Sequence, residues 1–103
     1  MAKPTQKVVL DINSPDFLGT FLSLRGPELE QVASGLGQLR GLEWQTVYTL
    51  KGLNWEAVSH LLAPNGSKMY SLRLSKKIRA LVYREADFMR FISLHPDHDS
   101  AYE

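Results

Sequence analysis

The sequence predicts an α+β fold, in which an N-terminal strand and an αα-hairpin pack on a small antiparallel sheet. Residues 69–94 contain three runs of strand-forming residues, and the short breaks between them allow only hairpin connections. Residues 14–40 instead repeat apolar side chains every three or four positions, which is the period of amphipathic helices. Residues 7–12 form a short run rich in β-formers. These patterns together predict two helices that cover one side of a C-terminal three-stranded meander.

Composition restricts the class of protein. At 103 residues the chain is expected to form one domain over residues 1–103, with residues 1–6 as a flexible tail. It has no cysteine, which excludes disulfides and thiolate metal sites. No apolar run reaches the roughly 20 residues of a membrane span, and the N-terminus lacks the apolar core of a signal peptide. We therefore expect a cytoplasmic protein that does not contact a membrane.

The αα-hairpin is predicted from its capping residues and its apolar stripes. Ser14 can cap the first helix, Pro15 suits its first turn, and Asp16 lies at its positive dipole end. The stripe expected to be buried consists of Phe17, Leu18, Phe21 and Leu22. The second helix is expected to follow Arg25-Gly26-Pro27 and to run to about Arg40, with Leu29, Val32, Ala33, Leu36 and Leu39 on helical spacing.

The middle of the chain is the least clear part. Within Gly41–Gly52, the apolar residues from Trp44 to Leu50 fit either a short strand or a packed loop. The run Trp55–Leu62 has apolar residues at helical spacing, and Asn54 precedes it as a possible cap. We therefore predict a short third helix there.

The register of the C-terminal meander decides which side chains share a face. The three predicted strands are Met69–Leu74, Ile78–Arg84 and Phe88–Leu94. A three-residue loop at Ser75–Lys77 pairs Leu74 with Ile78 and Arg73 with Arg79, whereas a two-residue turn would mix apolar and charged residues on both faces. Because a one-residue slip exchanges the two faces, burial should select the three-residue loop.

The predicted register gives the meander one apolar and one mixed face. The apolar face holds Leu72, Leu74, Ile78, Ala80, Val82, Met89 and Phe91. The other face holds Ser71, Arg73, Leu81, Arg79, Tyr83, Arg90, Ile92 and Leu94. The three arginines of this set are therefore expected to point away from the helices.

The net charge of +1 conceals a basic interval. No acidic residue lies between Glu56 and Glu85, yet that interval holds half of the 12 lysines and arginines. A local basic patch favours a polyanionic partner, and arginine in particular suits phosphate. The alternative is a solvated sheet edge, which lysines commonly protect.

Three short sequences within and after the meander resemble the RelE/ParE toxin superfamily. They are Leu72-Arg73 at the end of a strand, Arg79-Ala80-Leu81-Val82-Tyr83 after a short loop, and the end His95-Pro96-Asp97-His98-Asp99-Ser100-Ala101-Tyr102. The order of the predicted elements fits this superfamily over nearly the whole chain. The segment Trp44–Ser67 and the loop between Arg73 and Arg79 are longer than in typical relatives.

The resemblance to the RelE-like members implies ribosome-dependent cleavage of mRNA. Arg73 and Arg79 match the strand arginines of the family motif, and guanidinium groups stabilise a pentacoordinate phosphate. Tyr102 matches the C-terminal tyrosine, which stacks on a base, takes part in proton transfer, or simply packs on the sheet. Surface roles in a cross-strand ladder are the alternative for the arginines.

The histidines of the C-terminal cluster are the candidates for proton transfer. Histidine titrates near neutral pH, and we expect His98 rather than His95 to act, because His95 shares strand parity with buried Met89 and Phe91. The alternative is that Asp97 caps a terminal turn beside a solvated His98. Ligands this close in sequence converge poorly on one ion, so we expect no metal and no cofactor.

The implied partners are a cognate antitoxin, mRNA and the ribosome, with a toxin–antitoxin hetero-oligomer as the expected assembly. The residues expected to bind RNA are Lys68, Lys76, Lys77, Arg84 and Arg90. The alternative function is a ParE-like binding module that inhibits DNA gyrase without catalysis, and a third is an inactive or repurposed relative. The histidine-rich end of the chain favours the endoribonuclease.

Overall fold

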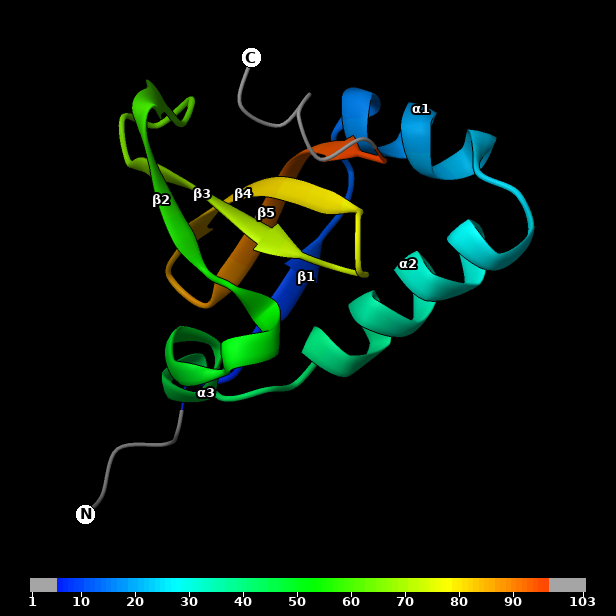
Figure 1. Cartoon of the computed structure of the whole chain (residues 1–103). Helices are drawn as coiled ribbons and strands as arrows, with labels where there is room; N and C mark the ends of the chain where they lie inside the picture. The colour runs from blue at the N-terminus through cyan, green and yellow to red at the C-terminus, as the bar shows by residue number, and fades with distance from the viewer. Residues whose placement is uncertain (1–5, 97–103) are drawn as a thin grey trace.

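The computed structural model describes residues 6–96, which form three α-helices and a five-stranded mixed sheet (Figure 1). The elements are β1 (Val9–Asp11), α1 (Pro15–Ser23), α2 (Gly26–Leu39), α3 (Trp44–Thr49), the 3-10 turn η1 (Lys51–Leu53), β2 (Glu56–Leu62), β3 (Lys68–Arg73), β4 (Arg79–Glu85) and β5 (Phe88–His95). The predicted α+β class is confirmed. None of the helices in this part of the chain is long and apolar enough to cross a membrane.

The sheet has the strand order β1-β5-β4-β3-β2. β1 pairs with β5 in parallel, and each later pair is antiparallel. The sheet is therefore mixed. It contains the predicted N-terminal strand and three-stranded meander, and β2 as one further strand. Of the tail expected at residues 1–6, only Gln6 is described, and its carbonyl accepts a hydrogen bond from the Trp44 N–H at 3.0 Å.

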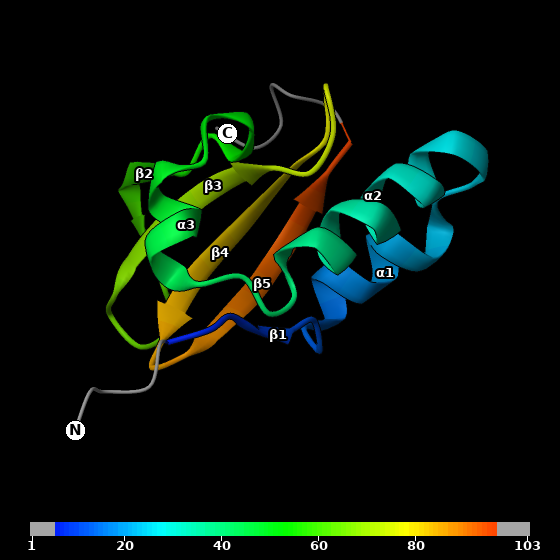
Figure 2. The same ribbon diagram turned by 90° about the horizontal axis from the view of Figure 1, so that it is seen from below.

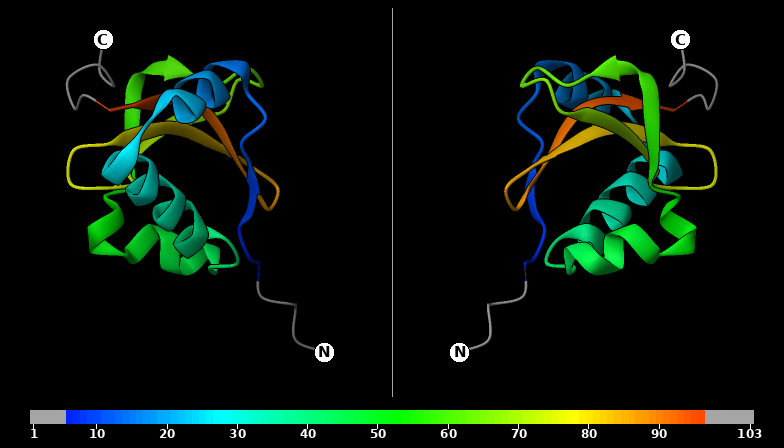
Figure 3. Two further views of the ribbon diagram at one scale, coloured as in Figure 1. Left: turned by 90° about the vertical axis from the view of Figure 1, so that its right-hand side faces the viewer. Right: turned by 90° about the vertical axis from the view of Figure 1, so that its left-hand side faces the viewer.

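All three helices contribute to a core on one face of the sheet, which we call the helix face (Figure 2). Side views show the strands arching over α2 and α3 (Figure 3). On α1, Phe17 is fully buried and its ring lies 5.1 Å from that of Phe91 on β5. Leu22 was expected in the same stripe but is 68% exposed, because the end of α1 extends past the sheet.

The predicted register of β3 and β4 is confirmed. Arg73 lies opposite Arg79, and the Leu74 N–H donates to the Ile78 carbonyl at 2.9 Å, as the three-residue loop requires. The helix-face residues predicted to be buried are indeed inaccessible: Leu72, Ile78, Ala80, Val82 and Met89 are all 0% exposed. The arginine pair therefore lies on the opposite face, which we call the outer face.

The middle of the chain differs from the prediction in both of its segments. Residues 44–49 form a helix rather than a strand or loop, with Trp44 and Val47 buried one turn apart. Residues 56–62 form β2 rather than a helix. Asn54, in the left-handed region with φ 55°, caps the end of η1 instead of the start of a helix. Pairing with the otherwise open edge of β3 supplies β2 with backbone hydrogen bonds, and this outweighs helical spacing.

A β-bulge in β5 makes a second prediction wrong. Phe91 lies opposite Val82 but Ser93 lies opposite Leu81, so Ile92 is an extra residue. The Ile92 carbonyl accepts a hydrogen bond from the Ser14 hydroxyl at 2.8 Å, which holds the bulge to the start of α1. Because a bulge changes the alternation of side chains, Leu94 joins the helix-face core and His95 moves to the outer face.

Candidate functional site

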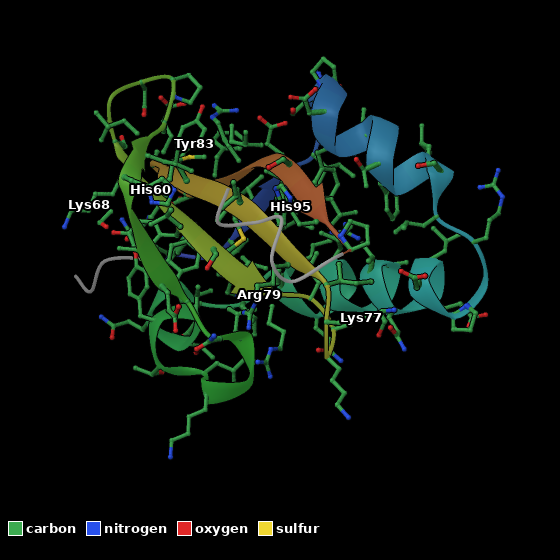
Figure 4. All side chains as sticks on the ribbon, turned by 45° about the horizontal axis from the view of Figure 1, so that its top comes forward. His60, Lys68, Lys77, Arg79, Tyr83 and His95 are labelled. Atoms are coloured by element: carbon green, nitrogen blue, oxygen red, sulfur yellow. The ribbon has the colours of Figure 1, made fainter. Side chains whose placement is uncertain are left out.

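The outer face of the sheet has two ends. The loop end carries the β3–β4 connection at residues 74–78, and the turn end carries the tight β4–β5 connection at Ala86-Asp87. Arg79 lies opposite Arg73 on one side and opposite His95 on the other. Three of the five residues expected to be catalytic therefore form one row across β3, β4 and β5 at the loop end. Figure 4 looks onto this face and shows Arg79 and His95 on adjacent strands.

Arg79 occupies the centre of this row. Its side chain is only 4% exposed, and its Nε has no hydrogen-bond partner in the part of the chain that the structure describes. With the Asn54 amide oriented to match its neighbours, the Asn54 oxygen accepts from Arg79 Nη1 at 3.3 Å and its nitrogen donates to Glu56 Oε1 at 3.2 Å. A buried guanidinium N–H without an acceptor is costly unless an anion or another acceptor binds it.

His95 ends the row on β5 and is half-buried. The Ser93 hydroxyl lies 2.8 Å from His95 Nε2, so the serine fixes the orientation of the ring. Burial lowers the pKa of His95 below its ordinary value. The imidazole is therefore mostly neutral at pH 7 and able to accept a proton.

The β3–β4 loop brings further positive charge to the loop end. Lys76 and Lys77 are both exposed, and the loop is held by the Ser75 hydroxyl, which accepts from the Ile78 N–H at 3.3 Å. Neither Arg73 nor Arg79 forms a salt bridge within residues 6–96. Among residues 6–96 the arginines and lysines of the loop end are thus not neutralised by ion pairs.

The other residues expected to bind RNA lie away from this end. Lys68 starts β3 whereas Arg73 ends it, which separates them by roughly 17 Å along the strand. Arg84 lies on the helix face, 4.3 Å from the Trp44 ring centre, and donates to the Tyr48 hydroxyl at 2.7 Å. The structure therefore gathers only Lys76 and Lys77 of the five with the catalytic candidates.

Arg90 points to the outer face, as predicted, but at the turn end. It forms ion pairs with Asp11 and, at 2.7 Å, with Glu85. The hydrogen bond from Arg90, and to a smaller extent that from Asn65, lowers the pKa of Glu85. The hydrogen bond to Glu85, and to a smaller extent that to Asp11, raises the pKa of Arg90. This arginine is already neutralised within the fold.

Two catalytic candidates, His98 and Tyr102, lie outside the described residues. The same holds for the expected return of the C-terminal tail across the sheet, so it stays a prediction. Sequence reasoning also missed two residues of the site. The sequence contains a signal for Ser93, because residues two apart on one strand point to the same face and Ser93 is two residues before His95. It contains no signal for Asn54, because the contact of Asn54 with Arg79 depends on β2 being a strand.

Comparisons of this chain with protein-family models, curated proteins and solved structures found no match. What the site can do therefore rests on its own geometry. Two guanidinium groups in a row can hold one phosphate diester, and a neutral imidazole beside them can accept a proton. This combination suits a reaction at a phosphorus centre next to a hydroxyl group.

Proposed function

We propose that this chain is an endoribonuclease that cleaves mRNA, in the manner of the RelE-like toxins that its sequence resembles. The observation that carries the proposal is the row of Arg73, Arg79 and His95 across three adjacent strands, in which Arg79 Nε lacks a partner among residues 6–96. The row combines a group for phosphate charge with a group for proton transfer.

The arginines act on the phosphate. Burial and the hydrogen bond with Asn54 hold Arg79 in place, so its guanidinium group loses little further side-chain freedom when a phosphate binds. Arg73 is exposed and supplies the second guanidinium from the neighbouring strand. Both charges stabilise the negative charge that builds up on the phosphoryl oxygens as the pentacoordinate state forms, since arginine stays protonated at neutral pH.

Proton transfer accompanies the cleavage. Neutral His95 accepts the proton of the ribose 2′-OH, and the 2′ oxygen forms a bond to phosphorus while the bond from phosphorus to the 5′ oxygen breaks. The leaving 5′ oxygen takes a proton from a general acid, which yields a 2′,3′-cyclic phosphate and a free 5′-OH. His98 and Tyr102 are the candidates for that acid.

His95 replaces His98 as the proposed base. The argument against His95 was its strand parity with buried residues, and the bulge at Ile92 removes that argument. Its lowered pKa also favours the proton-accepting form at neutral pH.

The proposed biological setting is a type II toxin–antitoxin system. The resemblance implies ribosome-bound mRNA as the substrate and an antitoxin that binds the toxin and silences it. The exposed charges of Arg73, Lys76 and Lys77 support a polyanionic or acidic partner at the loop end. A gyrase-inhibiting module would need no proton-transfer group beside the arginines, and so the position of His95 favours the nuclease.

The test is single-turnover cleavage of mRNA on programmed ribosomes, with the products mapped by primer extension. Wild-type protein should cut the message, and Arg79→Lys should cut it far more slowly, since an ammonium group cannot reproduce the two-pronged guanidinium contact. Absence of cleavage on ribosomes and on free RNA, together with gyrase-dependent DNA breaks upon expression, would replace this proposal by the gyrase-inhibiting alternative.

A further inference from the structure

A pocket of about 470 Å³ lies between the end of α2, the turn η1 and the end of β3, away from the row of Arg73, Arg79 and His95 except at its rim. Its walls are mainly aliphatic and include Leu39, Leu42, Leu50, Leu53 and Leu74. Two glycines, Gly35 and Gly52, also line it. This volume and apolar lining are typical of small-molecule sites.

The rim of the pocket carries charge of one sign. Arg73 and Lys76 both line it, and among residues 6–96 no Asp or Glu does. Lys76 is exposed and Leu50 is 46% exposed, so the mouth is open to solvent. A molecule that fits must therefore be apolar along most of its length and anionic at one end.

We infer that this pocket binds a small amphipathic carboxylic acid with an unbranched alkyl chain, its carboxylate at Arg73 and Lys76 and its chain among the leucines. The leucine walls remove the chain from water, which provides most of the binding free energy. The positive charges of Lys76 and Arg73 at the rim attract the carboxylate.

The shape of the surface favours a small acid over an amphipathic helix of a partner protein. Beyond Gln38, a second and adjoining hollow along α2 is lined by polar residues, among them Glu30, Gln31 and Ser34. A docked helix would need apolar contacts over several turns. The leucine walls of the pocket instead end at a cationic rim formed by Arg73 and Lys76.

The experiment is isothermal titration calorimetry with decanoate, used below its critical micelle concentration, and with decan-1-ol as the uncharged comparison. One decanoate should bind per chain. Leu50→Glu places a carboxylate at the mouth and should weaken binding by at least about tenfold, which is 1.4 kcal/mol. Leu22→Glu makes the same change at a 68% exposed leucine of α1 and should leave binding within about twofold of wild type.

Two further measurements test the role of the charge. Lys76→Gln should weaken decanoate binding by about two- to fivefold, as expected for one exposed ionic contact, and should not change the binding of decan-1-ol. Circular dichroism establishes that each variant is folded. The inference is overturned if decanoate shows no saturable binding, if Leu22→Glu weakens it as much as Leu50→Glu, or if decan-1-ol binds as tightly as decanoate.

Discussion

The two ends of the outer face both present arginine, but in opposite electrostatic states. At the turn end, Arg90 is held by Asp11 and Glu85. At the loop end, Arg79 is more deeply buried than Arg90, yet its Nε has no partner among the described residues. Asn54 lies between its guanidinium group and the Glu56 carboxylate. The difference shows that the number of lysines and arginines along the chain does not locate a candidate site. What locates it is the absence of acidic side chains that would neutralise those residues.

The sequence explains this asymmetry. Asp11 and Glu85 flank Arg90 because β1 pairs in parallel with β5, and because the β4–β5 turn returns Glu85 to the same end. The β3, β4 and connecting-loop parts of the loop end come from the interval between Glu56 and Glu85, which contains no acid. An arginine there can be neutralised only by a group from elsewhere in the chain or by a ligand.

The largest expected effect on RNA cleavage distinguishes His95, which lies in the row with Arg73 and Arg79, from His60, which lies outside it. His95→Ala should lower single-turnover RNA cleavage by about 10²–10⁴, the range for loss of a general base. His60→Ala is the matched control, because His60 is exposed on the edge strand β2 and should leave the rate unchanged. Equal rates for the two variants would remove His95 from the mechanism.

The next effect compares the two arginines directly. Arg79→Lys keeps the charge but loses the planar donor set, and should lower the cleavage rate by about 10². Arg90→Lys makes the same change at the neutralised end and should leave cleavage nearly unchanged. A comparable loss in both variants would mean that the two ends of the face do not differ in function.

The pH dependence of cleavage sharpens the role of His95. Burial lowers its pKa, so the neutral, proton-accepting form persists to lower pH than for an exposed histidine. The rate should therefore stay constant as pH falls through the ordinary histidine pKa, and then drop up to about tenfold per pH unit. A rate that already falls at the ordinary histidine value would contradict a buried base.

The smallest expected effect concerns the stability of the turn end. The pKa of Glu85 is lowered by Arg90, so their contact stabilises the fold at neutral pH, and this contribution is lost as pH falls through the folded-state pKa of Glu85. Glu85→Gln should thus lower the melting temperature slightly at pH 7, and the difference from wild type should shrink as the pH falls through the folded-state pKa of Glu85. Glu30→Gln, on the exposed side of α2, is the control, and a pH-independent difference for Glu85→Gln would argue against the ion pair.

Periodicity and loop length were sufficient to predict the part of the site on β3 and β4. The pairing of Arg73 with Arg79 follows from burying Leu72, Ala80 and Val82, because only one register places all three on the same face. The α+β class follows from the same patterns. These are local rules that act between neighbours in sequence.

The rest of the site depends on contacts between distant segments. The bulge that turns His95 outward is held by Ser14, 78 positions earlier, and no alternation within β5 reveals it. The strand β2 has helical spacing and becomes a strand because β3 offers it an edge. In both cases tertiary hydrogen bonds outweigh local preference.

Gly35 links the two faces of the molecule mechanically. A Cβ at this position would lie 2.9 Å from the Leu74 carbonyl oxygen, so the backbone of α2 rests directly on the start of the β3–β4 loop. Any displacement of α2 there is passed to the loop without a side chain to absorb it. Even Gly35→Ala, which adds a single methyl group at a half-buried position, must therefore shift the helix or the loop that lies between Arg73 and Arg79.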